Sequence, residues 1–278
     1  SERVNFTDGK ITNGTGRVDR AFSPKAGLIY TPNDHLSVFA TYTNSFSTNT
    51  GEDVVTGLAL KPSIIDQFEI GMKKNFWNNA VALNLSLYQI ENRNFYQTAE
   101  FKNGLPNSDS NFKEFAGKMR SQGVELDITG NPYPNLSIIG GISYNHSVYL
   151  DTPADFGYVE NQRLVRTPST TANASVFYTF EKYVKGLKLG ASAYFVGDRI
   201  AGWNDTKETL DSRNGVSRFL EVGNYVTAAI SAGYEWQKFS VMGKVGNLFD
   251  TVDYNYHENY SVNPITPRNF YVTLTYKL

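Results

Sequence analysis

The sequence predicts an all-β protein whose antiparallel strands form an up-and-down barrel across a membrane. Three observations support this fold class. Apolar residues alternate with small or polar residues in segments of about ten residues. Short and long connections alternate between these segments without exception. Aromatic residues make up 14% of the chain and charged residues only 19%, below the roughly 25% usual for soluble domains.

Alternation with a period of two is clearest in three segments, which read VALNLSLY at 81–88, VTAAISAGYEW at 226–236 and FYVTLTYKL at 270–278. In each segment one face is apolar and the other is small or polar. A strand with lipid on one side and water on the other has this pattern. No long amphipathic helix is predicted.

The same pattern predicts eleven strands in chain order: 21–31, 36–46, 64–75, 80–97, 118–130, 135–150, 166–180, 186–200, 221–236, 238–248 and 267–278. Short turns join them in pairs at 32–34, 77–79, 131–134, 181–185 and 237. Long polar connections separate the pairs at 47–63, 98–117, 151–165, 201–220 and 249–266. Outer-membrane barrels have such short periplasmic turns and long extracellular loops.

A soluble antiparallel barrel or sandwich is the alternative, with the apolar face forming a core. Strands of soluble proteins average about five or six residues, whereas these approach the roughly 9–11 residues of a bilayer-crossing strand. Aromatic residues also gather near the predicted strand ends, where interfacial girdles lie. They are Tyr30, Phe76, Trp77, Tyr133, Tyr178, Phe180, Trp236 and Phe239.

Composition excludes several functional classes. The chain has no cysteine, which removes disulfides, thiolate catalysis and cysteine-based zinc sites. A formal net charge of −1 provides no electrostatic footprint for nucleic acid. No run of about 18 apolar residues predicts a transmembrane helix. His35, His146 and His257 share no metal-ligand spacing, and no Ser-His-Asp arrangement predicts an enzyme.

Several segments resemble one family. They read FSPKAGLIYTPNDHLSVFATYTNSF at 22–46, IIDQFEIGMKKNFWNNAVALNLSLYQIENRN at 64–94, RSQGVELDITGNPYPNLSIIGGISYN at 120–145, GNLFDTVDY at 246–254 and PRNFYVTLTYKL at 267–278. Together they resemble TonB-dependent outer-membrane receptors, particularly siderophore receptors of the ferrichrome type.

The resemblance implies a barrel of twenty-two strands with an N-terminal plug domain inside it. This chain matches only the C-terminal half of such a barrel. Residues 1–20 would be the end of an extracellular loop, and residues 21–278 would be the C-terminal portion of the barrel, with the plug outside this segment. Eleven strands with a polar lumen would leave open edges, which lipid does not tolerate.

The implied function is energised import of a ferric siderophore, without chemistry on the ligand and without a resident metal or cofactor. The implied partners are the plug domain, the TonB complex reached through the N-terminal part, outer-membrane lipid and the barrel-assembly machinery. Receptors for another nutrient, such as a cobalamin, haem or an oligosaccharide, are alternatives. A structural barrel component without transport is another.

Two groups of residues are candidates for contacts, and one for assembly. Ligand-binding candidates are the loop aromatics Phe101, Phe156, Tyr158, Trp203, Tyr254, Tyr256 and Tyr260. Plug-facing candidates in the lumen are Glu69, Lys73, Glu125, Asp127, Glu235 and Lys244. The candidate assembly signal is the apolar face of Phe270, Val272, Leu274, Tyr276 and Leu278, although the family usually ends on an aromatic residue rather than leucine.

Each group also has a plainer interpretation. The loop aromatics could pack loop against loop, and the lumen charges could belong to a solvated wall.

The five long loops carry net formal charges of −1, −1, −2, 0 and −3, or −7 in all. Because a triscatecholate ferric complex is strongly anionic, this charge favours a weakly charged hydroxamate-type siderophore.

Overall fold

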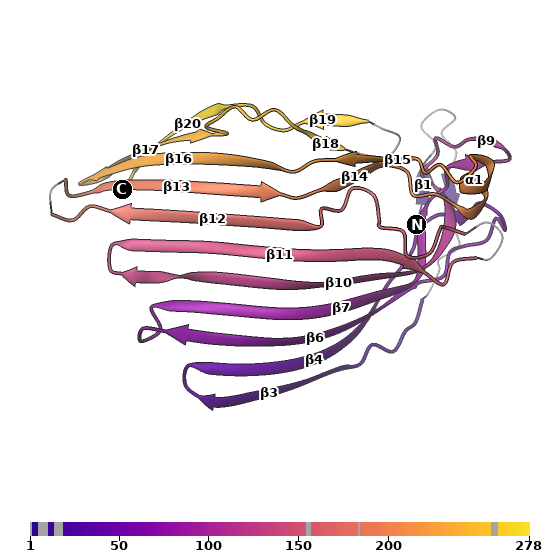
Figure 1. Ribbon diagram of the computed structural model, residues 1–278, viewed down its shortest axis with the longest axis horizontal. Helices are drawn as coiled ribbons and strands as arrows, with labels where there is room; N and C mark the ends of the chain where they lie inside the picture. Colours follow the sequence, from indigo (N-terminus) through magenta and orange to yellow (C-terminus); the bar gives the residue numbers. More distant parts are fainter. Residues whose placement is uncertain (1, 5–10, 14–18, 154–156, 183, 257–260) are drawn as a thin grey trace.

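A computed structural model of the chain describes residues 2–4, 11–13, 19–153, 157–182, 184–256 and 261–278. Its main feature is one antiparallel sheet that contains all eleven predicted strands (Figure 1). The strands are β3 (Lys25–Asn33), β4 (Leu36–Ser47), β6 (Ser63–Phe76), β7 (Val81–Thr98), β10 (Phe112–Tyr133), β11 (Leu136–Leu150), β12 (Thr170–Thr179), β13 (Leu187–Val196), β16 (Tyr225–Trp236), β17 (Phe239–Gly246) and β20 (Asn269–Tyr276).

Each of these strands pairs with its neighbours in the sequence, in simple up-and-down order. The predicted topology is therefore confirmed. The wall is only partly closed, because β3 and β20 lie at its two edges and do not pair with each other. Short turns lie at one end of the strands, and long loops with their short strands lie at the other (Figure 1).

The predicted boundaries differ by four residues or more at five strands. Two of them, expected at 21–31 and 166–180, begin four residues later, at Lys25 and Thr170. The strand expected at 186–200 ends at Val196, and the hairpin of β14 (Arg199–Gly202) with β15 (Phe219–Val222) follows in a separate sheet. The strand expected at 221–236 is interrupted as well. Its first two residues belong to β15, and β16 begins only at Tyr225. The break falls at Gly197, whose position leaves no room for a side chain against the Thr170 carbonyl.

The strand β10 is longer than predicted, because it begins at Phe112 rather than 118. It has 22 residues, about twice the length needed to cross a bilayer. Its first residues therefore lie in the long-loop region, where they continue the pairing with β7 as far as Thr98.

Pairing register places the apolar residues of neighbouring strands in one row on one face. In one row, Leu28 pairs with Ala40, Ala40 with Ile70, and Ile70 with Leu87. Leu28 is 73% exposed and Ile70 53%, far from the burial of a soluble core. Exposure of this kind is expected where lipid covers the face.

The opposite face carries the predicted lumen charges. Because Glu69 pairs with Thr41 and Tyr88, it lies on the face away from Ile70. On the same face, Glu235 forms ion pairs with Lys188 and Lys277. The other candidates share this side by alternation, and they are Lys73, Glu125, Asp127 and Lys244.

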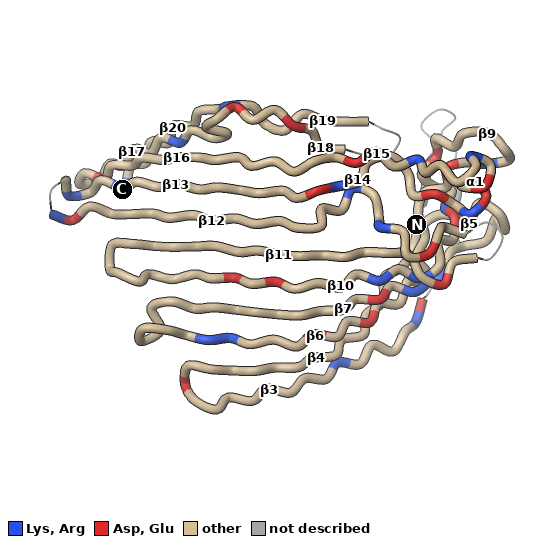
Figure 2. The backbone as a smooth tube through the Cα atoms, in the orientation of Figure 1, with Lys and Arg blue, Asp and Glu red and all other residues tan. Residues whose placement is uncertain are grey.

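Buried side chains lie mainly at the long-loop end. Ala116, Tyr149 and Tyr158 form a small core, with Phe95 and Leu164 packed against it. Figure 2 shows that most charged residues also lie at this end, with few along the middle of the strands.

The loops contain short elements of their own. They are β1 (Glu2–Val4), β2 (Ile11–Asn13), β5 (Glu52–Asp53), β8 (Phe101–Lys102), β9 (Leu105–Pro106), α1 (Lys207–Ser212), β18 (Tyr254–Tyr256) and β19 (Val262–Pro264). No helix among the described residues is long and apolar enough to span a bilayer.

We predict that a charge on the apolar face destabilises the barrel and that a charge on the polar face does not. Ile142 lies on the apolar face beside Leu126 and Ala172, whereas the next residue, Ser143, lies beside Glu125. Ile142→Lys should cost about 2–4 kcal/mol of folding free energy near the bilayer midplane. Ser143→Lys should cost much less.

The measurement is denaturant unfolding of the intact protein in lipid vesicles, with heat modifiability on gels as a second readout. Equal losses of stability in the two variants would show that the assignment of the faces is wrong.

Candidate functional site

A cavity of about 610 Å³ lies among the long loops. Four segments line it: the 47–63 loop, the ends of β7 and β10 with the residues between them, the region around Tyr158, and α1. Its aromatic residues are Tyr96, Phe101, Phe115 and Tyr158, and its charged residues are Asp53, Lys61, Glu100, Glu114 and Glu208. A volume of this size is typical of small-molecule sites, which span roughly 300–1,000 Å³.

The 47–63 loop forms one wall of the cavity. Its strand β5 pairs in parallel with the first residues of β10. The Asp53 carboxylate accepts hydrogen bonds from the backbone of Val55 and Thr56, at 3.1 and 2.8 Å, and from the Thr56 hydroxyl at 2.9 Å. These bonds fix the turn that follows β5, because an aspartate side chain readily bonds backbone two or three residues ahead.

Tyr158 forms a buried part of the cavity wall and is only 5% exposed. Its ring stacks on Tyr149, with the centroids 4.6 Å apart and the planes at 12°. Its hydroxyl donates a hydrogen bond to Glu114. Burial and the neighbouring charge of Glu114 raise the pKa of Tyr158 well above its usual value. The hydroxyl therefore remains a donor at neutral pH.

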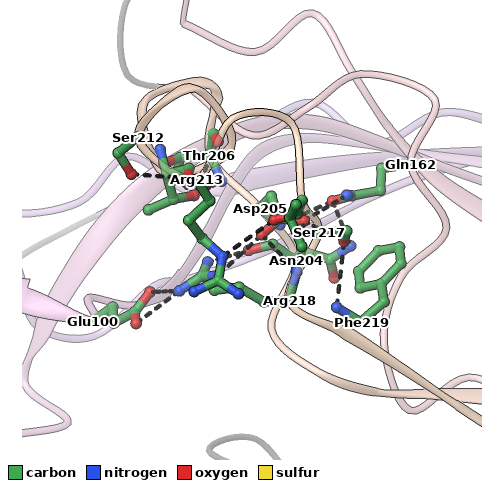
Figure 3. A network of polar contacts seen from close by, with 12 residues as sticks. Glu100, Gln162, Asn204, Asp205, Thr206, Ser212, Arg213, Ser217, Arg218 and Phe219 are labelled. Carbon is green, nitrogen blue, oxygen red and sulfur yellow. Dashed lines mark hydrogen bonds and ion pairs between the residues drawn. The ribbon is translucent and has the colours of Figure 1, made fainter.

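An ion-pair network centred on Arg218 connects two loops beside the cavity (Figure 3). The guanidinium donates two hydrogen bonds to Glu100, at 2.8 and 2.7 Å, and one to Asp205 at 3.0 Å. It also donates to the Asn204 carbonyl at 2.7 Å. Because Glu100 follows β7 and Asp205 precedes α1, the network fixes these two parts of the cavity wall together.

The Asp205 side chain is fully buried. Burial alone would raise its pKa, but hydrogen bonds from Ser217, Arg218 and Gln162 outweigh burial, so the pKa of Asp205 lies below its usual value. Burial likewise opposes the charge of Arg218, but Glu100 and Asp205 raise the pKa of that guanidinium. Asp205 and Arg218 are therefore both charged at neutral pH, and each charge depends on its partners.

The helix α1 has a capping box at its start. The Thr206 hydroxyl accepts from the Thr209 backbone at 3.1 Å, and the Thr209 hydroxyl accepts from the Thr206 backbone at 2.8 Å. Both threonines line the cavity, as does Glu208 between them. The capping box thus determines where α1 presents polar side chains to the cavity.

Of the predicted ligand-binding residues, Phe101 and Tyr158 line this cavity. Trp203 precedes Asn204 and is half-buried, outside the lining. Tyr254 and Tyr256 lie on β18, where the Tyr256 ring centroid is 5.8 Å from the Arg199 guanidinium. Phe156 and Tyr260 lie outside the described residues.

The charged residues of the site were not predicted from the sequence. The loop 201–220 has a net charge of zero, a hint that its charges pair, yet nothing local indicates that Arg218 pairs with a residue 118 positions away. Tyr96 and Phe115, whose ring centroids are 5.3 Å apart in edge-to-face contact, were also not predicted. Tyr96 lies in the strand expected at 80–97, and Phe115 lies in the loop expected at 98–117 but belongs to β10.

The sequence model for TonB dependent receptor-like β-barrels matches residues 2–248. The chain belongs to this family. Its members are transport receptors of the bacterial outer membrane. The fold, the family and the resemblance predicted from sequence are thereby confirmed.

Two curated relatives come from Pseudomonas aeruginosa. The metal-pseudopaline receptor CntO is 26% identical over 275 residues, which are 96% of this chain and 36% of that protein. The ferripyoverdine receptor is 24% identical over 247 residues, 87% of this chain and 28% of that protein. The chain spans about a third of the length of these relatives.

Solved structures show the same fold. The ferripyoverdine receptor of P. aeruginosa bound to ferripyoverdine aligns with a TM-score of 0.74 at 23% identity, over 96% of this chain and 34% of that one. The closed form of the ferric-catecholate receptor Fiu from E. coli K12 aligns with a TM-score of 0.69 at 22% identity, over 91% and 34%.

We predict that Arg218→Gln loosens the 201–220 loop without unfolding the barrel. Removal of the guanidinium leaves the buried Asp205 carboxylate without its cation, at a local cost of about 2 kcal/mol or more. Amide hydrogen exchange of peptides from 201–220 in the intact receptor should become at least about tenfold faster.

Arg213→Gln provides the matched control, since Arg213 lies in the same loop and its guanidinium Nε donates only to the Val216 carbonyl among the bonds described for it. Exchange that changes equally in both variants would show that the Arg218 network does not hold the loop.

Proposed function

We propose that this chain is the C-terminal portion of the barrel of an outer-membrane receptor that imports a ferric siderophore. The observation that carries the proposal is a ligand-sized cavity with aromatic walls, presented by the long loops of a TonB-dependent receptor barrel. Relatives named as ferripyoverdine and metal-pseudopaline receptors support the same class of ligand. The family is one of transport receptors, so we expect no chemistry on the ligand.

The proposal includes an orientation and an N-terminal part outside this segment. Residues 1–20 are the end of an extracellular loop, the long loops face the outside of the cell, and the short turns face the periplasm. The TonB complex acts through the N-terminal part, which contains the plug. In this proposal the six charges on the inner face hold the plug by ion pairs and hydrogen bonds. They are Glu69, Lys73, Glu125, Asp127, Glu235 and Lys244.

Ligand binding in this proposal involves aromatic contact at the loop cavity. Phe101 is 47% exposed and lines the cavity, so its ring is available to a ligand. The loops carry function because the rigid wall presents them. Trp203, Tyr254 and Tyr256 remain candidates for contacts elsewhere on the loops.

Ferric-siderophore binding to the intact receptor tests the proposal. Phe101→Ala should weaken binding about tenfold, as loss of a central aromatic contact does. Phe249→Ala is the control, because Phe249 is an exposed loop aromatic outside the cavity lining. Failure of every ferric siderophore to bind would overturn the function, and equal affinity of both variants would overturn the site.

We also propose that β20 carries the signal for barrel assembly. Phe270, Val272, Leu274 and Tyr276 share the outer face of β20, with Leu278 just beyond it, and all are exposed. Tyr276→Asp should lower the amount of folded receptor in the outer membrane, whereas Tyr271→Asp, on the inner face, should lower it less. Equal amounts of heat-modifiable barrel in both variants would count against the proposal.

A further inference from the structure

The loop cavity has an excess of negative charge. Carboxylates reach it from three of its lining segments, at Asp53, at Glu100 and Glu114, and at Glu208, whereas Lys61 is the one basic residue of the described lining. Arg218 neutralises only Glu100 among these four. Within the described residues, no ion pair neutralises the other three.

The three remaining carboxylates differ in their exposure and in their hydrogen bonds within the protein. Asp53 is occupied by the backbone of its own turn, and Glu208 is exposed on α1. Glu114 is largely enclosed, and it accepts a hydrogen bond from Tyr158. It lies at the loop end of β10, beyond the bilayer-crossing length, and burial raises the pKa of this carboxyl. The nearby Arg218 partly offsets this effect but forms its ion pair with Glu100. An enclosed carboxylate without an ion-pair partner is costly.

Aromatic rings complete the same wall. Tyr96 and Phe115 meet edge to face, and Phe101 and Tyr158 lie in the lining with them. The negative face of an aromatic ring attracts a cation, and the attraction increases where water is excluded. The 47–63 loop adds apolar surface from Val54, Val55 and Leu58.

From this combination we infer that the cavity binds a positively charged group of the ligand, an ammonium or a guanidinium at the end of an apolar arm. The carboxylates supply charge-assisted hydrogen bonds, and the rings and aliphatic side chains cover the arm. An anionic group would be repelled by these carboxylates. The inference rests on the proposed function and specifies its substrate class: a ferric siderophore with a basic group, rather than a neutral or strongly anionic one.

A matched pair of hydroxamate siderophores isolates this charge. Ferrioxamine B ends in a primary ammonium, and its N-acetyl derivative has the same iron-binding groups without that charge. Ferrichrome is a neutral hydroxamate complex, and ferric enterobactin is a strongly anionic triscatecholate. Dissociation constants of the four for the intact receptor in detergent, at neutral pH, are measured by fluorescence quenching.

Ferrioxamine B should bind about tenfold more tightly than its N-acetyl derivative, the size of one charge-assisted contact. Glu114→Gln and Glu208→Gln should each reduce this ratio, and the double variant should bring it close to one. Asp211→Asn removes a charge from α1 outside the cavity lining, so it should leave the ratio unchanged.

The outcomes separate this inference from the function on which it rests. Equal affinity for the matched pair, tighter binding of ferrichrome or ferric enterobactin than of ferrioxamine B, or a ratio that survives the double variant would overturn the cation site. Each of these results leaves siderophore transport standing. If none of the four ligands binds, the inference fails, and the wider set of ferric siderophores that tests the proposed function decides whether the function fails as well.

Discussion

The pairing of backbone groups in lipid is the constraint on which the rest of this structure depends. The bilayer core supplies no water to hydrogen-bond an unpaired N–H or C=O group, so each spanning strand must pair along both sides. The nine inner strands of the sheet satisfy this by pairing with the strands before and after them in sequence. The edges at β3 and β20 do not, which is why we expect further strands to pair with them.

The same constraint makes the strands predictable from sequence and the loops not. A period of two is local, so it indicates each strand and its lipid-facing side from a few residues. It does not show that Gly197 interrupts one strand or that β10 continues to Phe112, because these depend on a close backbone approach and on pairing with β7. Phe101 and Tyr158 were found as loop aromatics, but the ion pair from Arg218 to Glu100 depends on the folded loops.

Outside the bilayer, ion pairs fix the loop segments relative to one another, as backbone hydrogen bonds fix the strands within it. The Arg218 network holds segments before α1 and after β7 in one arrangement. A second network, in which Arg199 pairs with Asp253 at 2.8 Å, connects β14 to the loop before β18. Loops that are fixed in this way can present a cavity of constant shape, so that less ordering is required when a ligand binds.

The two networks also show why aromatic content alone does not identify a ligand site. Tyr256 covers Arg199, a cation that already has its carboxylate, so the ring completes a contact within the protein. Phe101 instead lies in a lining where Asp53, Glu114 and Glu208 have no ion-pair partner among the described residues. The two rings are equivalent in sequence terms. A positively charged group of a ligand would neutralise the unpaired carboxylates around Phe101. These carboxylates come together only in the folded loops, because they lie in segments far apart in the sequence.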